Sequence, residues 1–457
     1  MKRRDALKTI GGLAGMAGLS RFLPGCHGSS GDSQPVGITT YVYMMMENRS
    51  YDHFFGSRKL DGKAGDGIVA GTTLLDINNQ PVPLWVPDLN QECDRDPPHG
   101  WDALHQSFNN GLNDQFLKVH QMEYADANAI EPMQYLTSTQ VPVSYALADN
   151  YTSCDRWFCS VMGPTWPNRF YWHAGTSFGL MANTLPTQLS PSIYHRLNAK
   201  GIDWKYYYGN IPVVSVIMDI DVTPNVARFA DFLTDAAAGT LPPVVYIDPG
   251  FNDNDDHPPV HPINGQELIS AVYTALANSP QWNNVMLVIT YDENGGFYDH
   301  VPPPKTQDDL AAQGFDQLGF RVPTMVIGPY AKQNYVSSVQ YDHTSALRHL
   351  ENVFELDELS LRTSVANDLT DCIDLDRLAA GDPAPPIEIP AVDITQWPMS
   401  QECFGGSFKQ SHPILDWADA NPHRVAGLDL RGERDEYRRT IREYLAANRV
   451  ATAAKVR

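Results

Sequence analysis

Two pairs of oxygen-bearing side chains follow apolar runs of this sequence and could hold a metal ion. The pair Glu47-Asn48 comes directly after the run 38–46, and the pair Asp292-Glu293 comes directly after the run 285–291. Carboxylate and carboxamide oxygens are the ligands that hard divalent cations prefer in proteins. A single acidic pair at the end of a strand is as often a cap or a turn former. Two such pairs in one chain favour a metal site.

A hydroxyl that could act as a nucleophile lies in the segment 161–173. Pro167 fits the first turn of a helix, where its missing N–H costs nothing, so Thr165 is expected just ahead of a helix N-terminus. Backbone N–H groups and the helix dipole at that position favour an anionic phosphate. A hydroxyl that touches a cation there can be deprotonated and attack phosphorus. From this segment alone, a plain helix cap is the better interpretation of Thr165.

The elements that would position these groups have the pattern of an α/β protein. The runs before the two acidic pairs read as buried strands, and 244–247 and 322–327 have the same character. Helical patterns over 265–278 and 344–356 separate such runs, which predicts a largely parallel sheet covered on both faces. In open α/β sheets the ligand site lies beyond the carboxyl ends of the strands, where the acidic pairs fall.

Composition indicates a globular protein that does not bind polyanions. The 457 residues are 42% hydrophobic and 19% charged, which excludes a disordered, collagenous or coiled-coil chain. Asp and Glu number 54 against 33 Lys and Arg, which gives a net charge of −21. No basic run interrupts this deficit, so we expect no nucleic-acid partner.

The first 26 residues are expected to be a targeting segment. Arg3-Arg4 precedes a Gly-, Ala- and Leu-rich stretch from Thr9 to about Leu23, which fits a twin-arginine signal peptide. A chance arginine pair in a Sec-type signal is the alternative. Cys26 ends a lipoprotein-like box, so lipid anchoring stays open. We expect export to the periplasm or out of the cell, and no later segment has the ~18 apolar residues of a membrane span.

The remainder is expected to comprise a catalytic domain and a C-terminal extension. The catalytic domain is predicted over 36–380. The extension, 381–457, is predicted to hold a Pro-rich connector over 381–398 and a helical tail packing on the catalytic domain, with a helix over 431–448.

Five cysteines follow Cys26, and their spacing matches no CxxC motif. In an exported protein we expect two disulfides and one free or buried thiol, with the connectivity undetermined. These cysteines are Cys93, Cys154, Cys159, Cys372 and Cys403.

Four segments resemble, in the right order, the motifs of a bacterial phosphoesterase family. The segment 45–56, MMENRSYDHFFG, is similar to the family signature ENRSFDHYFG. The family contains the non-haemolytic phospholipases C and related acid phosphatases, within the alkaline phosphatase superfamily. A chance match of four long ordered motifs is very improbable. The other three segments are GPTWPNR at 163–169, YDENGGFYDHVPP at 291–303 and YDHTS at 341–345.

The resemblance implies a fold and a cofactor. The implied fold is an alkaline-phosphatase-like three-layer α/β/α sandwich with a largely parallel central sheet. The implied cofactor is one divalent metal ion, and Ca, Mg, Mn and Zn all stay open because a mixed oxygen site accepts each of them. The implied metal ligands are Glu47, Asn48, Thr165, Asp292 and Glu293.

The resemblance also implies roles in the reaction. Thr165 matches the nucleophile and would form a phospho-threonine that water then hydrolyses. His99 and His257 match catalytic histidines that would stabilise phosphate oxygens or protonate the leaving alkoxide. Candidate substrate-binding residues are Asn168, Arg169, His300 and His343, with a structural role as the alternative for each of them. Seven further histidines, His412 among them, have no motif support.

The expected activity is that of an exported metal-dependent phospholipase C acting on phosphatidylcholine-type phosphodiesters. An acid phosphatase acting on phosphomonoesters is the alternative, because the paired β-rich C-terminal modules of larger phospholipases C are missing. A lipid- or sugar-binding protein without catalysis is a minor alternative. The expected partners are a phospholipid head group or a small phosphate ester, with transient contact at a membrane surface left open. The oligomeric state is undetermined.

Overall fold

The computed structural model describes most of the chain beyond the predicted signal peptide. The predicted targeting segment 1–26, including Cys26, lies outside the described residues, and so do Cys93 and Cys403. The described residues are 37–88, 95–185, 191–214, 223–392, 412–422 and 432–450.

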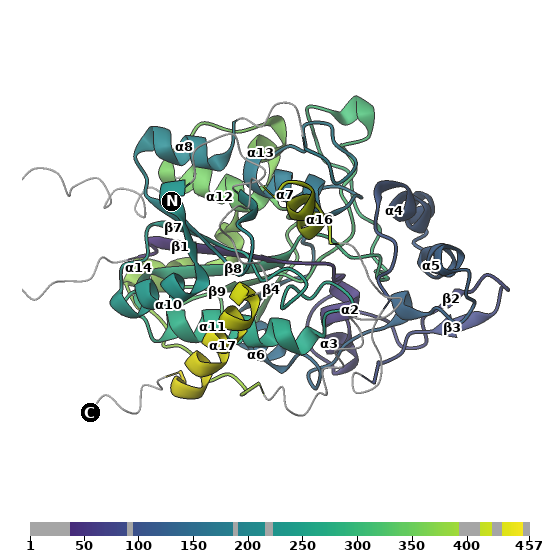
Figure 1. The fold of residues 1–457 in the computed structure, drawn as a ribbon, viewed down its shortest axis with the longest axis horizontal. Coiled ribbons are helices and arrows are strands. Elements are labelled where there is room, and N and C mark those ends of the chain that lie inside the picture. Colours follow the sequence, from purple (N-terminus) through teal and green to yellow (C-terminus); the bar gives the residue numbers. More distant parts are fainter. Residues whose placement is uncertain are drawn as a thin grey trace, which may run out of the picture.

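An eight-stranded sheet forms the middle layer (Figure 1). Its strand order is β10-β4-β9-β8-β1-β7-β5-β6; β9 is antiparallel to both neighbours, and the other neighbouring pairs are parallel. The predicted largely parallel sheet is therefore confirmed. Every residue of β1 and β8 is buried, as continuous apolar runs predict for central strands. The strands are β1 (Thr40–Met46), β4 (Thr152–Cys154), β5 (Trp204–Tyr208), β6 (Val226–Arg228), β7 (Val244–Ile247), β8 (Val285–Tyr291), β9 (Met325–Ile327) and β10 (Tyr335–Ser337).

Helices cover both faces of this sheet, which gives the expected three-layer α/β/α arrangement (Figure 1). On one face lie α6 (Pro142–Asn150), α10 (Phe229–Ala238), α11 (Pro262–Ala277) and α17 (Gly432–Ala447). On the other face lie α7 (Thr165–Ala174), α8 (Ile193–Lys200), α12 (Thr344–Phe354) and α13 (Leu361–Val365).

Smaller elements gather at one end of the sheet, around the segment that follows β1 (Figure 1). A two-stranded antiparallel ribbon pairs β2 with β3 there. These elements are α2 (Tyr51–Phe55), α3 (Ser57–Leu60), β2 (Thr73–Leu75), β3 (Pro81–Pro83), α4 (Trp101–Phe108) and α5 (Phe116–Tyr124).

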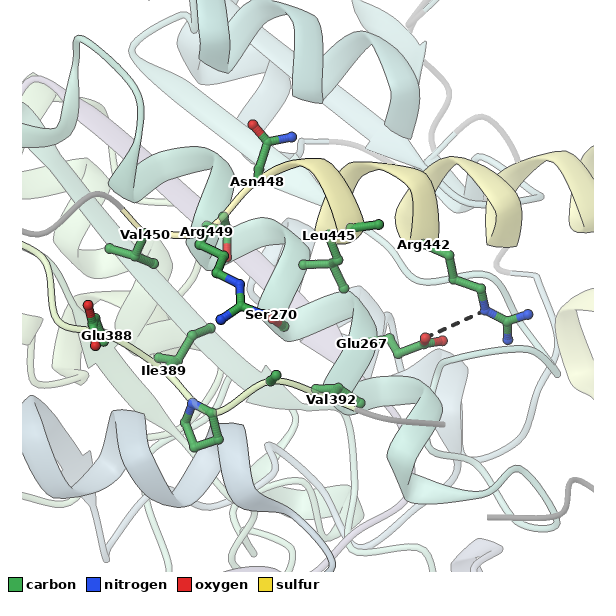
Figure 2. A pocket seen from close by; sticks show the side chains of 14 residues that line it. Glu267, Ser270, Glu388, Ile389, Val392, Arg442, Leu445, Asn448, Arg449 and Val450 are labelled. Atoms are coloured by element: carbon green, nitrogen blue, oxygen red, sulfur yellow. Dashed lines mark ion pairs between the residues drawn. The ribbon is translucent and has the colours of Figure 1, made fainter. Parts of the chain in front are cut away.

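The described C-terminal segments pack on the main sheet domain. After α14 (Leu375–Ala380), the backbone carbonyl of Ala384 accepts a hydrogen bond from the Trp282 indole at 2.9 Å. Ile414 and Ala418 of α16 (Pro413–Ala420) join the main hydrophobic core. A cavity of about 410 Å³ lies between α11, α17 and residues 388–392, and an ion pair joins Arg442 to Glu267 beside it (Figure 2).

The cysteines differ from the expectation. Cys154, Cys159 and Cys372 are free and buried, and the sulfur atoms of Cys154 and Cys372 lie 3.9 Å apart. Two disulfides would need four of the five cysteines, so the predicted pair of disulfides is wrong.

Within the described residues, no helix combines the length and the apolar character needed to cross a bilayer.

Candidate active site

Three neighbouring parallel strands of the sheet end in acidic residues at the same edge. In the order β8, β1, β7, the residues that follow the strands are Asp292, Glu47 and Asp248. The register pairs Met46 with Tyr291, so Glu47 and Asp292 come from adjacent positions. Glu47 therefore meets Asp248 and Asp292, each more than 200 positions away in the sequence, beyond the carboxyl ends of the strands.

Arg169 joins these three strand ends. Its guanidinium donates hydrogen bonds to Asp248 Oδ1 at 3.0 Å and to Glu47 Oε1 at 2.9 Å, and its Nε lies 3.7 Å from Asp292 Oδ2. The side chain is only 1% exposed, and it lies over the ring of Phe251. The guanidinium is thus held by the acidic groups of the site itself, and the substrate contact expected for Arg169 stays a prediction.

Thr165 is the first residue of α7. The sequence predicted it just ahead of the helix, so the helix begins one residue earlier than expected. Its side chain does not cap the helix. The hydroxyl instead donates to Glu293 Oε1 at 3.3 Å, and the backbone N–H of Trp166 donates to Asn183 Oδ1 at 2.9 Å. The structure thus brings Thr165 to the second acidic pair, as the resemblance implied.

Asn168 shapes the loop that leads into α7. Its Oδ1 accepts from the N–H of Val161, and its Nδ2 donates to the carbonyl of Gly163 at 2.9 Å. Further contacts reach the carbonyls of Val161 and Pro164. Asn168 therefore holds the backbone beside Thr165, and its expected contact with substrate stays a prediction.

The oxygen atoms around Thr165 fit a metal ion. Asn48 Oδ1, Asp292 Oδ2 and Glu293 Oε2 are buried, and each lacks a hydrogen-bond partner. A buried oxygen without a donor is costly, and a cation removes that cost. Together with Glu47 and Thr165, these residues are a hard oxygen set of the kind that holds Ca²⁺, Mg²⁺ or Mn²⁺ and also accepts Zn²⁺.

The pKa values of the acidic residues reflect their burial and the charges of their neighbours. Burial raises the pKa of Asp292 well above its usual value, and the charge of Glu47 adds to the effect. Burial and the charge of Asp292 raise the pKa of Glu293 in the same way. Burial would also raise the pKa of Glu47, but His412 and Arg169 lower it to about 2.

Close backbone approach brings the two motif loops together. Asn48 adopts a left-handed backbone conformation with φ of 60°, which asparagine tolerates better than most residues. Gly295 also has a positive φ, and a Cβ at that position would lie 2.5 Å from the carbonyl oxygen of Asn48. A side chain at position 295 would collide with the backbone of the first motif, so this position requires glycine.

His99 and His257 lie beside the oxygen set, as the resemblance implied. His99 Nε2 is 3.3 Å from Asn48 Nδ2 and 3.7 Å from Glu293 Oε1. The rings of His99 and His257 are 5.6 Å apart. Each Nδ1 lies 2.7 Å from a backbone carbonyl, that of Pro97 or Pro258. A carbonyl only accepts, so Nδ1 carries the hydrogen and Nε2 of the neutral ring is an acceptor.

His343 holds the backbone of the second acidic pair in place. Its Nε2 donates to the backbone carbonyl of Asp292 at 2.6 Å, and its Nδ1 accepts from the indole of Trp157 at 3.3 Å. Burial lowers the pKa of His343 to about 4. Both ring nitrogens are engaged within the protein, which favours the structural alternative, and the substrate contact stays a prediction.

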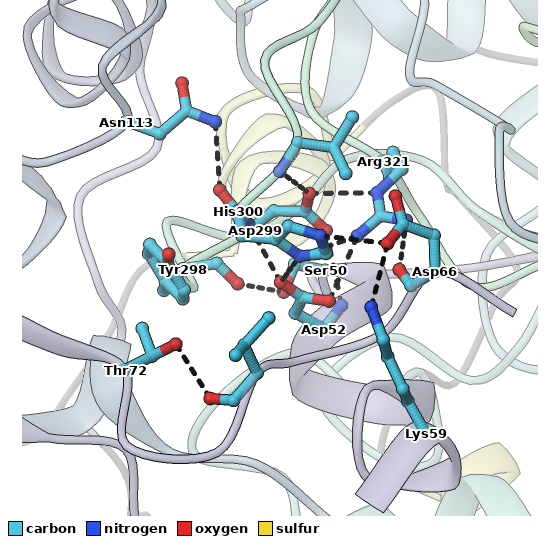
Figure 3. Close-up of polar contacts among 12 residues, drawn as sticks. Ser50, Asp52, Lys59, Asp66, Thr72, Asn113, Tyr298, Asp299, His300 and Arg321 are labelled. Atoms are coloured by element: carbon cyan, nitrogen blue, oxygen red, sulfur yellow. Dashed lines mark hydrogen bonds and ion pairs between the residues drawn. The ribbon is translucent and has the colours of Figure 1, made fainter. Parts of the chain in front are cut away.

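His300 belongs to a separate ionic cluster around Arg321 (Figure 3). Its Nδ1 lies 2.6 Å from Asp52 Oδ2, and its Nε2 lies 3.3 Å from Asp66 Oδ1. The buried guanidinium of Arg321 binds Asp52 and Asp299. Burial opposes a charge on His300, but Asp52 raises its pKa. These contacts tie α2 to the segment after the second acidic pair and do not include the residues around Thr165.

Sequence reasoning missed three residues of the site. Asp248 directly follows the apolar run 244–247, and its position at a strand end is the sequence signal that marks it. Asp96 lies 3.4 Å from His99, and burial raises its pKa to about 6. His412 lies 2.7 Å from Glu47 Oε2 and comes from the C-terminal segment, where no motif marks it.

Comparisons with known proteins identify the family of this chain. The family model described as "Phosphoesterase family" matches residues 38–357. "Non-specific phospholipase C6" of Arabidopsis thaliana is 32% identical over 356 residues, covering 70% of this chain and 68% of the relative. "Phospholipase C B" of Mycobacterium tuberculosis is 31% identical over 384 residues, covering 68% of this chain and 72% of the relative.

A solved structure from Vibrio parahaemolyticus, described as a protein in the alkaline phosphatase superfamily, aligns with a TM-score of 0.36 and 11% identity. The alignment covers 50% of this chain and 64% of that chain.

Replacing Asp292 with Asn should lower metal binding without lowering the unfolding temperature of the metal-free protein. Asn keeps an acceptor for the N–H groups of Asn48 and Glu293 but removes one ligand charge. Loss of even an indirect contact to a metal costs roughly 10–100-fold in affinity, so we expect at least that loss here. Burial raises the pKa of Asp292, so its ionised form destabilises the metal-free fold, and Asn relieves this.

Elemental analysis after dialysis and thermal unfolding in a chelator would measure the two effects. The control is Asp235→Asn, which disrupts the ion pair with Lys205 and leaves the proposed metal ligands unchanged. Wild-type metal content in Asp292→Asn would contradict the metal site.

Proposed function

The chain belongs to the phosphoesterase family and is a phosphoric ester hydrolase, and on this premise we propose that it is a metal-dependent phospholipase C. The proposed substrates are phosphatidylcholine-type phosphodiesters. The observation that carries the proposal is the approach of the Thr165 hydroxyl to Glu293, at 3.3 Å, among buried oxygens that lack donors. The phospholipase C names of the plant and mycobacterial relatives support a diester over a monoester.

The first proposed step is attack by Thr165 on phosphorus. A bond forms between Thr165 Oγ1 and phosphorus, and the bond between phosphorus and the diacylglycerol oxygen breaks. The hydroxyl hydrogen passes toward Glu293 Oε1, the acceptor that it already faces. Glu47, Asn48, Thr165, Asp292 and Glu293 would hold the metal, which when bound would supply positive charge that polarises the phosphoryl group and favours the deprotonated hydroxyl.

The second proposed step is hydrolysis of the phospho-threonine by water. The new bond joins the water oxygen to phosphorus, the Oγ1–phosphorus bond breaks, and the phosphorylated head group leaves. His99 and His257 are the proposed proton carriers, because the Nε2 atom of each neutral ring is an acceptor. In the first step the diacylglycerol oxygen takes up the proton that Thr165 gave up, and in the second step a proton of the attacking water returns to Thr165 Oγ1.

Replacing Thr165 with Ala should abolish turnover and leave the fold intact. We expect kcat to fall by roughly 10³-fold or more, because the attacking oxygen is removed. Thr165→Ser keeps that oxygen and is the matched control, with activity expected to persist. A burst experiment with phosphorus labelling would detect the phospho-enzyme in the wild type and not in Thr165→Ala. Near-normal turnover in Thr165→Ala would remove Thr165 from the nucleophile role.

A paired assay would identify the ester class. The purified protein should hydrolyse p-nitrophenylphosphorylcholine faster than p-nitrophenyl phosphate, and a chelator should stop both reactions. Faster hydrolysis of the monoester at acid pH would assign the protein as an acid phosphatase instead. Metal binding without hydrolysis of either ester would favour the binding-only alternative.

We also propose export by the twin-arginine route, which the Arg3-Arg4 pair supports. Substitution of both arginines by lysine should retain the precursor in the cytoplasm, as cell fractionation and immunoblotting would measure. Processed protein outside the cytoplasm in that variant would contradict this route.

A further inference from the structure

We propose that His412 is a positioning residue, supplied by the C-terminal segment, that fixes the Glu47 carboxylate for metal binding. The inference rests on the proposed metal-dependent function and extends the site beyond residues 38–357, the region that the family model matches. Nothing in the four motifs assigns a role to His412.

The contact between His412 and Glu47 is short and fully buried. His412 Nε2 lies 2.7 Å from Glu47 Oε2, and both side chains have no solvent exposure. Asp255 Oδ2 lies 3.6 Å from the same nitrogen. The ring packs against Phe251, with centroids 5.0 Å apart, and against His257, with centroids 5.2 Å apart. Contacts on several sides therefore hold the imidazole in one orientation.

The local backbone fixes which nitrogen of His412 faces Glu47 as a donor. His412 is the N-cap of α16, and its Nδ1 accepts a hydrogen bond from the backbone N–H of Ile414 at 3.3 Å. An accepting Nδ1 carries no hydrogen, so the ring hydrogen is on Nε2. Nε2 therefore donates to Glu47 Oε2. In this tautomer His412 has no free lone pair for a metal, which makes it a partner of a ligand rather than a ligand.

Glu47 is consequently held from two directions. Arg169 donates to Oε1 at 2.9 Å, and His412 donates to Oε2 at 2.7 Å. A carboxylate with one donor on each oxygen is restricted in rotation about its terminal bond. Outer partners that orient a ligand in this way contribute substantially to metal affinity. Removal of His412 should free the Glu47 carboxylate and leave a buried oxygen without its donor.

A second histidine in the chain caps a helix in the same way. The sequence His-Pro-Ile occurs at 261–263 and at 412–414. His261 is the N-cap of α11, and its Nδ1 accepts from the N–H of Ile263 at 3.1 Å. The capping role is thus common to both histidines, and His412 additionally contacts the carboxylates of Glu47 and Asp255. His261 therefore provides a matched control for the loss of a cap.

The experiment compares metal binding by the full-length wild type with His412→Leu, His412→Gln and His261→Leu. Each protein is stripped with a chelator, dialysed and titrated calorimetrically with Ca²⁺, Mn²⁺ and Zn²⁺, and the metal that binds the wild type most tightly is used for the comparison. No substrate is present, so failure of the proposed substrate class does not affect the measurement. Thermal unfolding of each stripped protein reports the cost to the fold.

We expect one ion per chain in all four proteins. The dissociation constant should rise roughly 10–100-fold in His412→Leu. It should be largely restored in His412→Gln, because the Gln amide nitrogen can occupy the position of Nε2 and donate to Glu47. It should be unchanged in His261→Leu.

Three outcomes would overturn the inference. Wild-type affinity in His412→Leu would show that the contact with Glu47 does not matter for the metal. Equal losses in His412→Leu and His412→Gln, with equal unfolding temperatures, would exclude the donor role. A second ion in the wild type that disappears in His412→Leu would make His412 a direct ligand. A wild type that binds no divalent ion would instead refute the metal-dependent function on which the inference rests.

Discussion

The bridge from Arg169 to three strand-end carboxylates is the interaction on which the site depends. Asp292, Glu47 and Asp248 follow the adjacent strands β8, β1 and β7, so the parallel sheet forces like charges together out of water. Buried charges are tolerated only when they are paired, and breaking such a pair costs about 3–5 kcal/mol. A planar guanidinium can serve several carboxylates at once, which a lysine cannot do with the same geometry. One cation still leaves buried oxygens without a donor, and this deficit is the physical argument for the proposed metal ion.

The same arginine determines where Thr165, the proposed nucleophile, lies. Arg169 comes one turn after Thr165 on α7, so both side chains face the strand ends. Anchoring the guanidinium therefore anchors the hydroxyl, and Asn168 fixes the backbone before the helix through hydrogen bonds to Val161 and Gly163. A reacting oxygen held in this way needs little further ordering when substrate arrives.

A second set of buried arginines connects the motif segments to one another. Arg321 pairs with Asp52 of the first motif and with Asp299 of the third. Arg362 binds Asp342 of the fourth motif and the backbone carbonyl of Ser160, just ahead of the nucleophile loop. Much of the motif sequence is thus scaffold, because charged side chains at these positions hold loops that regular secondary structure does not hold.

The sequence by itself determined the elements and the chemistry of the site. Apolar runs predicted β1, β7 and β8, and the acidic pairs after β1 and β8 predicted a hard-cation site, because strand burial and ligand preference are local properties of residue types. The tertiary structure decided which polar groups have free atoms. Asn168, His300 and His343 resemble substrate ligands until their partners are known, and those partners come from other segments. His412 joins Glu47 across 365 positions, and a contact of that range depends on how the C-terminal segment packs, which no local pattern records.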